Sequence, residues 1–198
     1  MFYQLFLTVV AFIVLSVVTA IPSPLAHIHH HRQENPDNIV KLESADNYCM
    51  IMPKNPHANI GDSESPGGMM TYCSATARWD DSQGTIPGGF WKISDYQSGS
   101  SPDTGARFAQ LTGCIDSGMV DRLNPDDLGG QYDSSGGKKG EGNPANSVCL
   151  GYKHYIELIE PESGRACLKC CDDPDDCPLK RDTSGCPVVI PGNYFDCV

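Results

Sequence analysis

Ten cysteines constrain this 198-residue chain more than any other feature of its sequence. Four of them fall within the eleven-residue stretch CLKCCDDPDDC, Cys167 to Cys177. Because the number is even and the chain opens on a secretory-type segment, we expect disulfide bonds in an oxidising compartment, with no thiol left over. The expected disulfide cysteines are Cys49, Cys73, Cys114, Cys149, Cys167, Cys170, Cys171, Cys177, Cys186 and Cys197. The sequence does not determine their pairing.

The first twenty residues have the character of a cleavable signal peptide. Phe2 to Ala20 carries no charge, and Val18-Thr19-Ala20 suits a signal peptidase site. The alternative is a lone membrane anchor, but the run is barely long enough for about 30 Å of hydrocarbon and has no flanking Lys/Arg cluster. Its n-region, however, also lacks Lys and Arg. We predict a signal peptide at 1–20, secretion to the extracellular space and no stable membrane insertion after cleavage.

A metal or redox centre is the alternative interpretation of the cysteine-dense stretch. Cys167 and Cys170 have C-x-x-C spacing, but the next cysteine is adjacent and no second pair has the matching spacing of a zinc site. Adjacent cysteines usually bridge to different partners, because a bond between neighbours strains the backbone. The four aspartates of DDPDD lack the glycine and the distal Glu of a calcium loop, which predicts a solvated acidic loop tip. We therefore expect no metal and no other cofactor in this stretch.

Residues 21–38 contain prolines, a histidine run and no apolar periodicity, which indicates a flexible leader or propeptide. The histidines, His27 and His29 to His31, belong to residue types that hold copper or zinc. Cleavage after Ala26 would make His27 an amino-terminal copper ligand, although the sequence otherwise does not resemble copper monooxygenases. A copper or zinc protein using this leader is the third of three functional hypotheses.

The charge of the chain excludes whole classes of partner. The formal net charge is −11, and basic residues are scattered. Nucleic-acid binding needs a basic face that neutralises phosphates, and anionic membranes attract polybasic segments. We expect neither partner.

The body of the chain reads as short strands separated by turns rich in Gly and Pro, with no sustained helical period. The strand candidates are Ile39–Leu42, Tyr48–Met52, Phe90–Ser94, Arg107–Thr112 and Tyr152–Ile159. We predict a mainly β fold, a small β-sandwich or open barrel with long loops, stapled by disulfides and with little helix apart from the signal peptide. A single domain over 39–198, with a cysteine-dense C-terminal segment at 167–197, is expected.

The strongest local signal is a β-hairpin. Residues 152–159 alternate between two faces, EPESG turns the chain, and RACLKCC runs back. In this register Glu160 faces Arg165, and Cys167 lies opposite Leu158 on the buried side. Residues 61–68 and 124–147 are predicted to be surface loops.

None of the motif-like triplets in the sequence fits a catalytic site. Asp103-Thr104-Gly105 and Asp116-Ser117-Gly118 imitate the triplets of aspartic proteases, but they lie too close together for two lobes and suit tight turns better. A G-x-S-x-G elbow, a P-loop and an HExxH motif are absent from the sequence. A carboxylate pair for glycoside hydrolysis has no local signature, so that activity stays open.

Aromatic side chains are the best candidates for a binding surface. They stack on sugars or anchor protein partners, and they also fill cores. The candidates are Trp79, Trp91, Tyr96, Tyr132 and Tyr194, with FWKISDY (90–96) the densest cluster.

The ensemble resembles a known group. A signal peptide, an acidic mature chain, ten cysteines and the ending CLKCCDDPDDCPLKRDTSGCPVVIPGNYFDC are similar to fungal small secreted cysteine-rich proteins, many treated as candidate effectors. The likeness is most specific over 143–197. It implies no catalytic residues.

Three hypotheses follow. The first is a secreted, non-enzymatic, effector-like or cell-surface protein that binds an extracellular protein or glycan. The second is a secreted polysaccharide-active hydrolase or carbohydrate binder, and the third is the copper or zinc protein.

Overall fold

The computed structural model describes residues 39–65, 67–134, 147–181 and 183–197. The predicted signal peptide and the histidine leader lie outside the described residues. All statements about the structure refer to these ranges.

Two five-stranded sheets build the fold, which confirms the prediction of a mainly β, disulfide-stapled protein. The first sheet has the order β4-β3-β2-β1-β8, formed by Gly84–Ile86, Met69–Ser74, Tyr48–Pro53, Ile39–Leu42 and Val148–Cys149. The second has the order β5-β6-β10-β9-β7, formed by Trp91–Ser100, Arg107–Ile115, Arg165–Cys171, His154–Glu160 and Gly130–Asp133. The helices are single turns: α1 (Ile60–Ser63), η2 (Ser117–Met119), η3 (Pro174–Asp176) and α2 (Cys186–Val189). Long helices are absent from the described residues.

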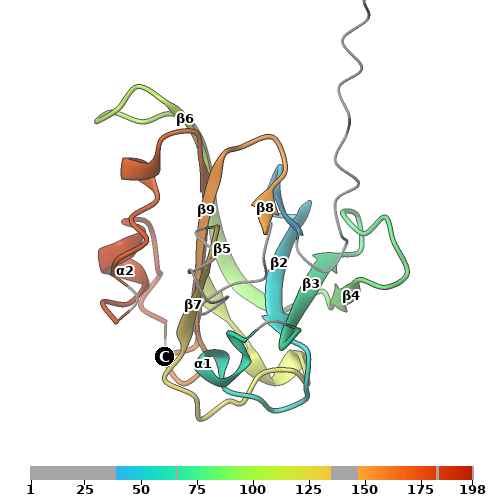
Figure 1. The fold of residues 1–198 in the computed structure, drawn as a ribbon. Coiled ribbons are helices and arrows are strands. Elements are labelled where there is room, and N and C mark those ends of the chain that lie inside the picture. Colours follow the sequence, from blue (N-terminus) through green and yellow to red (C-terminus); the bar gives the residue numbers. More distant parts are fainter. Residues whose placement is uncertain (1–38, 66, 135–146, 182, 198) are drawn as a thin grey trace, which may run out of the picture. The chain divides into compact units, whose positions relative to one another are not determined.

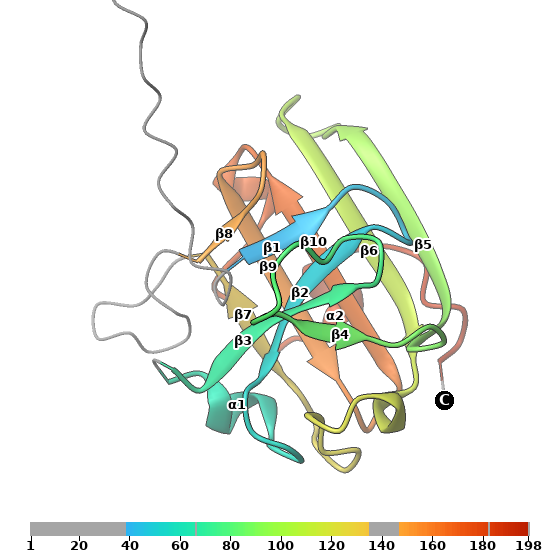
Figure 2. The same cartoon turned by 90° about the vertical axis from the view of Figure 1, so that its right-hand side faces the viewer.

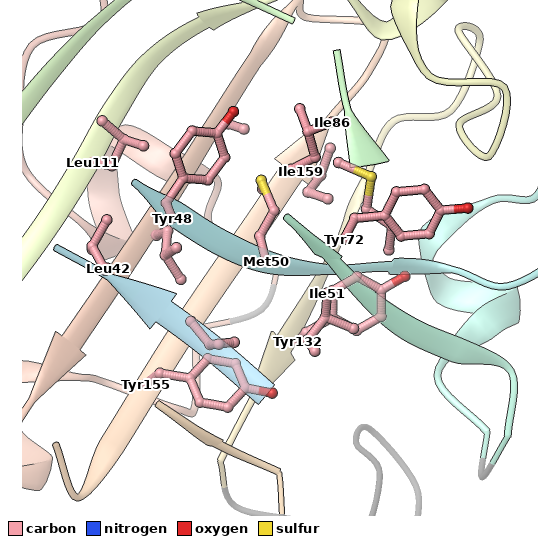
Figure 3. Packing of buried hydrophobic residues seen from close by; sticks show 14 of the residues in the cluster. Leu42, Tyr48, Met50, Ile51, Tyr72, Ile86, Leu111, Tyr132, Tyr155 and Ile159 are labelled. Atoms are coloured by element: carbon pink, nitrogen blue, oxygen red, sulfur yellow. The ribbon is translucent and has the colours of Figure 1, made fainter. Parts of the chain in front are cut away.

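The main hydrophobic core lies between the two sheets. Apolar side chains from both, such as Met50 of β2 and Leu111 of β6, are fully buried in one cluster, and Figure 3 shows them interleaved. Figure 2 shows the β1–β4 strands in front of the sheet that contains β6 and β10. Burial of this apolar surface is the dominant force that holds sheet against sheet.

A second core lies on the other face of the β9–β10 hairpin. Ile156 and Leu158 of β9 pack there against the C-terminal segment that carries α2. In Figure 1 that segment, the β9 sheet and the β2 sheet follow one another as layers from left to right. Strand β9 is therefore buried on both faces, which explains why both of its alternating sets contain apolar residues.

The predicted hairpin is confirmed residue by residue. Glu160 pairs with Arg165 and Leu158 with Cys167, and the Glu160 carboxylate accepts a hydrogen bond from Arg165 Nε in an ion pair. Of the other predicted strands, Ile39–Leu42 has the predicted bounds, whereas β5 and β6 each extend beyond the predicted C-terminal ends.

Five disulfides join the ten cysteines, and the structure contains no free thiol. The pairs are Cys49–Cys73, Cys114–Cys197, Cys149–Cys170, Cys167–Cys186 and Cys171–Cys177. The adjacent Cys170 and Cys171 bond to different partners, as expected for neighbours on opposite faces of a strand. Cys170 faces the inter-sheet core and Cys171 the second core.

Two loop predictions are wrong in part, although residues 64–65, 67–68 and 124–129 form no helix or strand. The predicted loop 124–147 contains β7, which pairs with β9 and covers its outer edge. The predicted loop 61–68 begins inside α1. In both cases pairing or packing with distant residues orders a segment whose local composition favours turns.

The prediction of a solvated acidic loop tip at DDPDD is also wrong. Asp176 is buried, and its two carboxylate oxygens accept hydrogen bonds from Ser101 Oγ and Thr104 Oγ1, both at 2.5 Å. Asp172 forms an ion pair with Arg107 at 2.8 Å, and Asp173 accepts a hydrogen bond from the amide of Asp175 at the start of η3. These aspartates organise the segment, because hydrogen bonds offset the cost of removing a carboxylate from water.

Candidate functional site

A cleft of about 320 Å³ opens where the β1–β2 turn, the segment after β3 and the β4–β5 connection come together. Its floor is aromatic, its rim is polar, and small residues give it width. The lining residues are Ala45, Asp46, Tyr48, Ser74, Ala75, Thr76, Ile86, Pro87, Gly88, Gly89, Trp91 and Ser94. We call it the Tyr48–Trp91 cleft.

The aromatic floor comes from both sheets. Tyr48 begins β2 on the core face, and Trp91 begins β5 at a β-bulge between Trp91 and Ile93. The two rings meet edge to face, with centroids 6.3 Å apart and planes at 82°. Phe90 supports Trp91 from inside the core in a second edge-to-face contact at 5.8 Å. Such contacts add to the hydrophobic gain and hold each ring in one orientation.

Tyr48 keeps its hydroxyl protonated. Burial raises the pKa of Tyr48, the nearby indole N–H of Trp91 lowers it in part, and the charge of Asp46 raises it further. The Trp91 N–H is buried and makes no hydrogen bond of good geometry within the described residues. The hydroxyl of Tyr48 therefore acts as a neutral donor and acceptor, not as a proton-transfer group near pH 7.

The rim is fixed by hydrogen bonds from β3 to the β1–β2 turn. Ser74 Oγ donates to the carbonyl of Asp46 at 2.8 Å and accepts from the amide of Tyr48 at 3.3 Å. Thr76 Oγ1 donates to the same Asp46 carbonyl. Because the backbone of Asp46 is held this way, its exposed carboxylate stays at the rim, and among the described residues no donor contacts that carboxylate.

A second hollow, of about 410 Å³, lies on the other side of the segment after β3. Ala75 lines both hollows, and Trp79 lines the second with 48% of its surface exposed. The loop is rigid, since the buried Gln83 accepts hydrogen bonds from the amides of Trp79 and Asp80 through Oε1, at 3.1 and 3.3 Å. Arg78 Nε also donates to the Gln83 carbonyl at 3.0 Å. The loop thus presents an exposed indole beside the cleft from a backbone that is held by hydrogen bonds.

The structure separates the five predicted aromatic candidates. Trp91 lines the cleft and Trp79 the adjoining hollow, so these two lie around one loop. Tyr132 is fully buried, and Tyr96 is half-buried against the core. Tyr194 donates its hydroxyl to the carbonyl of Ile190 at 2.6 Å within the C-terminal segment.

Sequence reasoning missed Tyr48 and Asp46 as site residues. In YCMIMP, Tyr48 alternates with Met50 and Met52, which indicates a core position but not a cleft. A ligand-facing role for Tyr48 depends on its meeting Trp91 of the opposite sheet, and no local pattern contains that information.

The carboxylates around the cleft bear on the hydrolase hypothesis. Asp46 is the one carboxylate among the residues that line the cleft, and the adjoining hollow adds those of Asp80 and Asp81. Glycoside hydrolysis generally uses two carboxyl groups flanking the scissile bond. The cleft by itself thus offers a single carboxylate to a polar ligand.

The carboxylate of Glu157 lies outside the cleft and, unlike that of Asp46, is buried. It is fully buried between the sheets, its Oε2 accepts from the amide of Ile51 at 3.0 Å, and its Oε1 has no partner among the described residues. Burial raises its pKa well above the usual 4.5. The nearby Tyr132 and Tyr155 are also buried (Figure 3), with hydroxyls bonded to Ser63 and Ser147. The Glu157 carboxylate thus lies in the core between the two sheets.

Two kinds of feature are absent from the described part of the chain. It contains no helix long and apolar enough to span a membrane. It also contains no group of three or more His, Cys, Asp or Glu side chains placed to hold a metal ion.

Comparisons with protein-family models, with curated proteins and with solved structures give no match for this chain.

Proposed function

We propose that this chain is a secreted, non-enzymatic binding protein whose ligand is a neutral oligosaccharide. The ligand occupies the Tyr48–Trp91 cleft and extends over the indole of Trp79. The observation that carries the proposal is the combination of an aromatic floor, a hydroxyl- and carboxylate-bearing rim and an exposed tryptophan around one loop. Sugars offer apolar C–H faces to aromatic rings and hydroxyl groups to polar rims, so this combination matches their chemistry.

Charge selects neutral glycans over anionic ones. The chain carries a net charge of −11. The carboxylate of Asp46 stands at the rim of the cleft, and those of Asp80 and Asp81 line the adjoining hollow. Arg78 is already paired with Asp81 at 3.3 Å. Sulfated or uronic-acid chains would meet like charge at short range, which disfavours their binding.

In this proposal the protein acts in the extracellular space. Five disulfides are compatible with a stable protein of an oxidising compartment, and one of them, Cys49–Cys73, joins β2 to β3 beside the cleft residues Tyr48 and Ser74. The signal-like residues 1–20 support secretion, and the resemblance to fungal small secreted cysteine-rich proteins supports an effector-like role at a cell surface.

The experiment is a glycan array probed with the oxidised, mature protein, followed by titration calorimetry with the strongest neutral hit. Trp79→Ala should weaken binding about tenfold, because a stacked tryptophan commonly contributes more than 1 kcal/mol to an interface. Asp46→Asn should weaken it by less, because it keeps one hydrogen-bonding oxygen. Leu128→Ala is the matched control, because Leu128 is 79% exposed and lines neither hollow.

Three results would refute the proposal. One is an array on which no neutral glycan is retained. Another is equal binding by Trp79→Ala and Leu128→Ala proteins. The third is the release of shortened oligosaccharide during incubation, which would establish the hydrolase hypothesis in place of binding.

A further inference from the structure

A second cleft, of about 430 Å³, lies on the outer face of the β5–β6–β10 part of the second sheet, away from the Tyr48–Trp91 cleft. In β10 the neighbouring Leu168 and Cys170 face the inter-sheet core, so Lys169 projects to the opposite side. The register aligns Gln97, Gln110 and Lys169 across three adjacent strands. Three polar side chains in a row on a partly covered face need a ligand or water to complete their hydrogen bonds.

Lys169 is the residue with the least complete set of partners. Its ammonium lies 5.0 Å from the ring centroid of Phe108, and it forms no hydrogen bond or ion pair with any described residue. Its side chain is half-buried, and that burial lowers the pKa of Lys169, whereas the charges of Asp176 and Asp103 raise it. Both oxygens of Asp176 are occupied by Ser101 and Thr104, as described above. The ammonium thus lines the cleft without a hydrogen bond to any of the carboxylates that also line it.

The walls of the cleft are cross-linked. The disulfide Cys171–Cys177 ties the acidic wall to β10, and Cys167–Cys186 ties the wall that carries α2 to the same strand. Gln110 Nε2 also donates to the carbonyl of Pro191 at 3.0 Å. A cavity of this size with fixed walls is within the range of small-molecule sites, and it loses little entropy when it binds.

Two further features define what could bind. Asp103 and Asp175 line the cleft with carboxylates that receive no side-chain hydrogen bond among the described residues. Pro178, Val188 and Val189 supply an apolar wall, and Val188 is 54% exposed. A ligand that satisfies these features has one anionic group for Lys169 and Arg181, which also lines the cleft, one cationic group for Asp103 and Asp175, and a small apolar body.

We propose that this cleft binds a free α-amino acid with an apolar side chain. Its carboxylate accepts hydrogen bonds from Lys169, its ammonium faces Asp103 and Asp175, and its side chain lies against Val188. The site is separate from the oligosaccharide site, and neither proposal depends on the other.

In the test, the oxidised, mature protein is titrated with L-leucine, and binding is measured by NMR chemical-shift changes or by calorimetry. Two blocked analogues serve as arms: L-leucinamide lacks the carboxylate, and N-acetyl-L-leucine lacks the ammonium. L-leucine should bind, and each analogue should bind at least about tenfold more weakly, because each leaves a charged group of the cleft without its partner. Lys169→Met keeps the stem of the side chain and should abolish binding. Asp103→Asn should weaken it several-fold.

Lys153→Met is the matched control, because Lys153 is exposed and does not line the cleft. The proposal is overturned if L-leucine does not bind, if either analogue binds as tightly as L-leucine, or if Lys169→Met and Lys153→Met bind L-leucine equally. The analogue comparison uses the unaltered chain, so it stays decisive even if Lys169→Met fails to fold. Neutral-glycan binding measured on the same samples should be unchanged.

Discussion

At the residue scale, Glu157 shows how a β strand can carry a charge into a core. The alternation of β9 sends Tyr155, Glu157 and Ile159 to the inter-sheet side. The carboxylate receives a single hydrogen bond, from Ile51 of the opposite sheet. Desolvation favours the neutral form of such a group, so the folded protein binds a proton there that the unfolded chain releases near pH 4.5.

Stability should therefore depend on pH through Glu157. Its pKa is raised in the folded state, so its contribution to the unfolding free energy is complete below about pH 4.5 and is lost as pH rises through the folded pKa. Glu157→Gln should remove this slope, which is at most about 1.4 kcal/mol per pH unit. Urea unfolding at a series of pH values from 4 to 8 measures it.

The control is Glu162→Gln, because it makes the same chemical substitution at an exposed position. If Glu157→Gln and Glu162→Gln proteins show the same pH slope as the unaltered chain, the buried carboxylate is not the source of the pH dependence.

At the element scale, a bulge in β5 positions the aromatic floor of the cleft. The register shifts between Trp91 and Ile93, opposite the end of β6, and bulges of this kind redirect a side chain. Gly113 of β6 makes the close approach possible, because a Cβ there would lie 2.2 Å from the carbonyl oxygen of Ile93.

Gly113→Ala should therefore destabilise the fold by about 1–3 kcal/mol, the usual range for overpacking, and displace Trp91. Thermal unfolding and tryptophan fluorescence would report the two effects. Gly61→Ala is the comparison, because no atom lies within 4 Å of a Cβ at Gly61. Equal stability of the two variants would contradict the close-packing argument.

The disulfides also differ in the length of chain that each one closes into a loop. Cys114–Cys197 joins residues 83 positions apart, whereas Cys171–Cys177 joins residues 6 apart. Loop-closure entropy predicts that replacing the first pair by alanine costs about 4–5 kcal/mol and replacing the second about 2 kcal/mol. Denaturant unfolding of the two double variants measures the order, and a reversed order would show that native packing outweighs chain entropy here.

At the scale of the whole molecule, two sheets, two cores and five bridges share the task of stabilisation. Four of the bridges end in the β10 strand or in the C-terminal segment that covers it. Two of them join these two parts to each other, whereas Cys114–Cys197 and Cys149–Cys170 join them to β6 and β8. A net charge of −11 opposes compaction through self-repulsion, and the covalent links offset that repulsion.

The mature protein should accordingly show no free thiol. Alkylation under native conditions should leave the intact mass unchanged, and alkylation after denaturing reduction should add ten groups, one for each cysteine. Mass spectrometry of the two samples gives the number of free and bonded cysteines, and the same masses locate the amino terminus of the mature protein. Several alkylated cysteines in the native sample would be incompatible with the bonded scaffold.

Much of the element-level fold can be predicted from the sequence. The alternation in 152–159 and the turn EPESG predict the β9–β10 hairpin with its Glu160–Arg165 pair, because both signals are local. Strand β7 could not be predicted: GQYD lies in a Gly-rich stretch, and only its pairing with β9 makes it a strand. The burial of Asp176 likewise depends on hydroxyls about seventy residues earlier in the chain.

The sequence by itself determined the β class, the disulfide-bonded state and the acidic character of the chain, because composition and short-range periodicity carry those properties. The tertiary structure alone decided which cysteines pair, which aromatic residues meet and where the charged groups stand. Tyr48 and Trp91 form one cleft, and Lys169 reaches another, only because packing of the two sheets and the C-terminal segment brings distant residues together. Contacts of that kind are set by long-range burial, for which a single sequence holds no local signal.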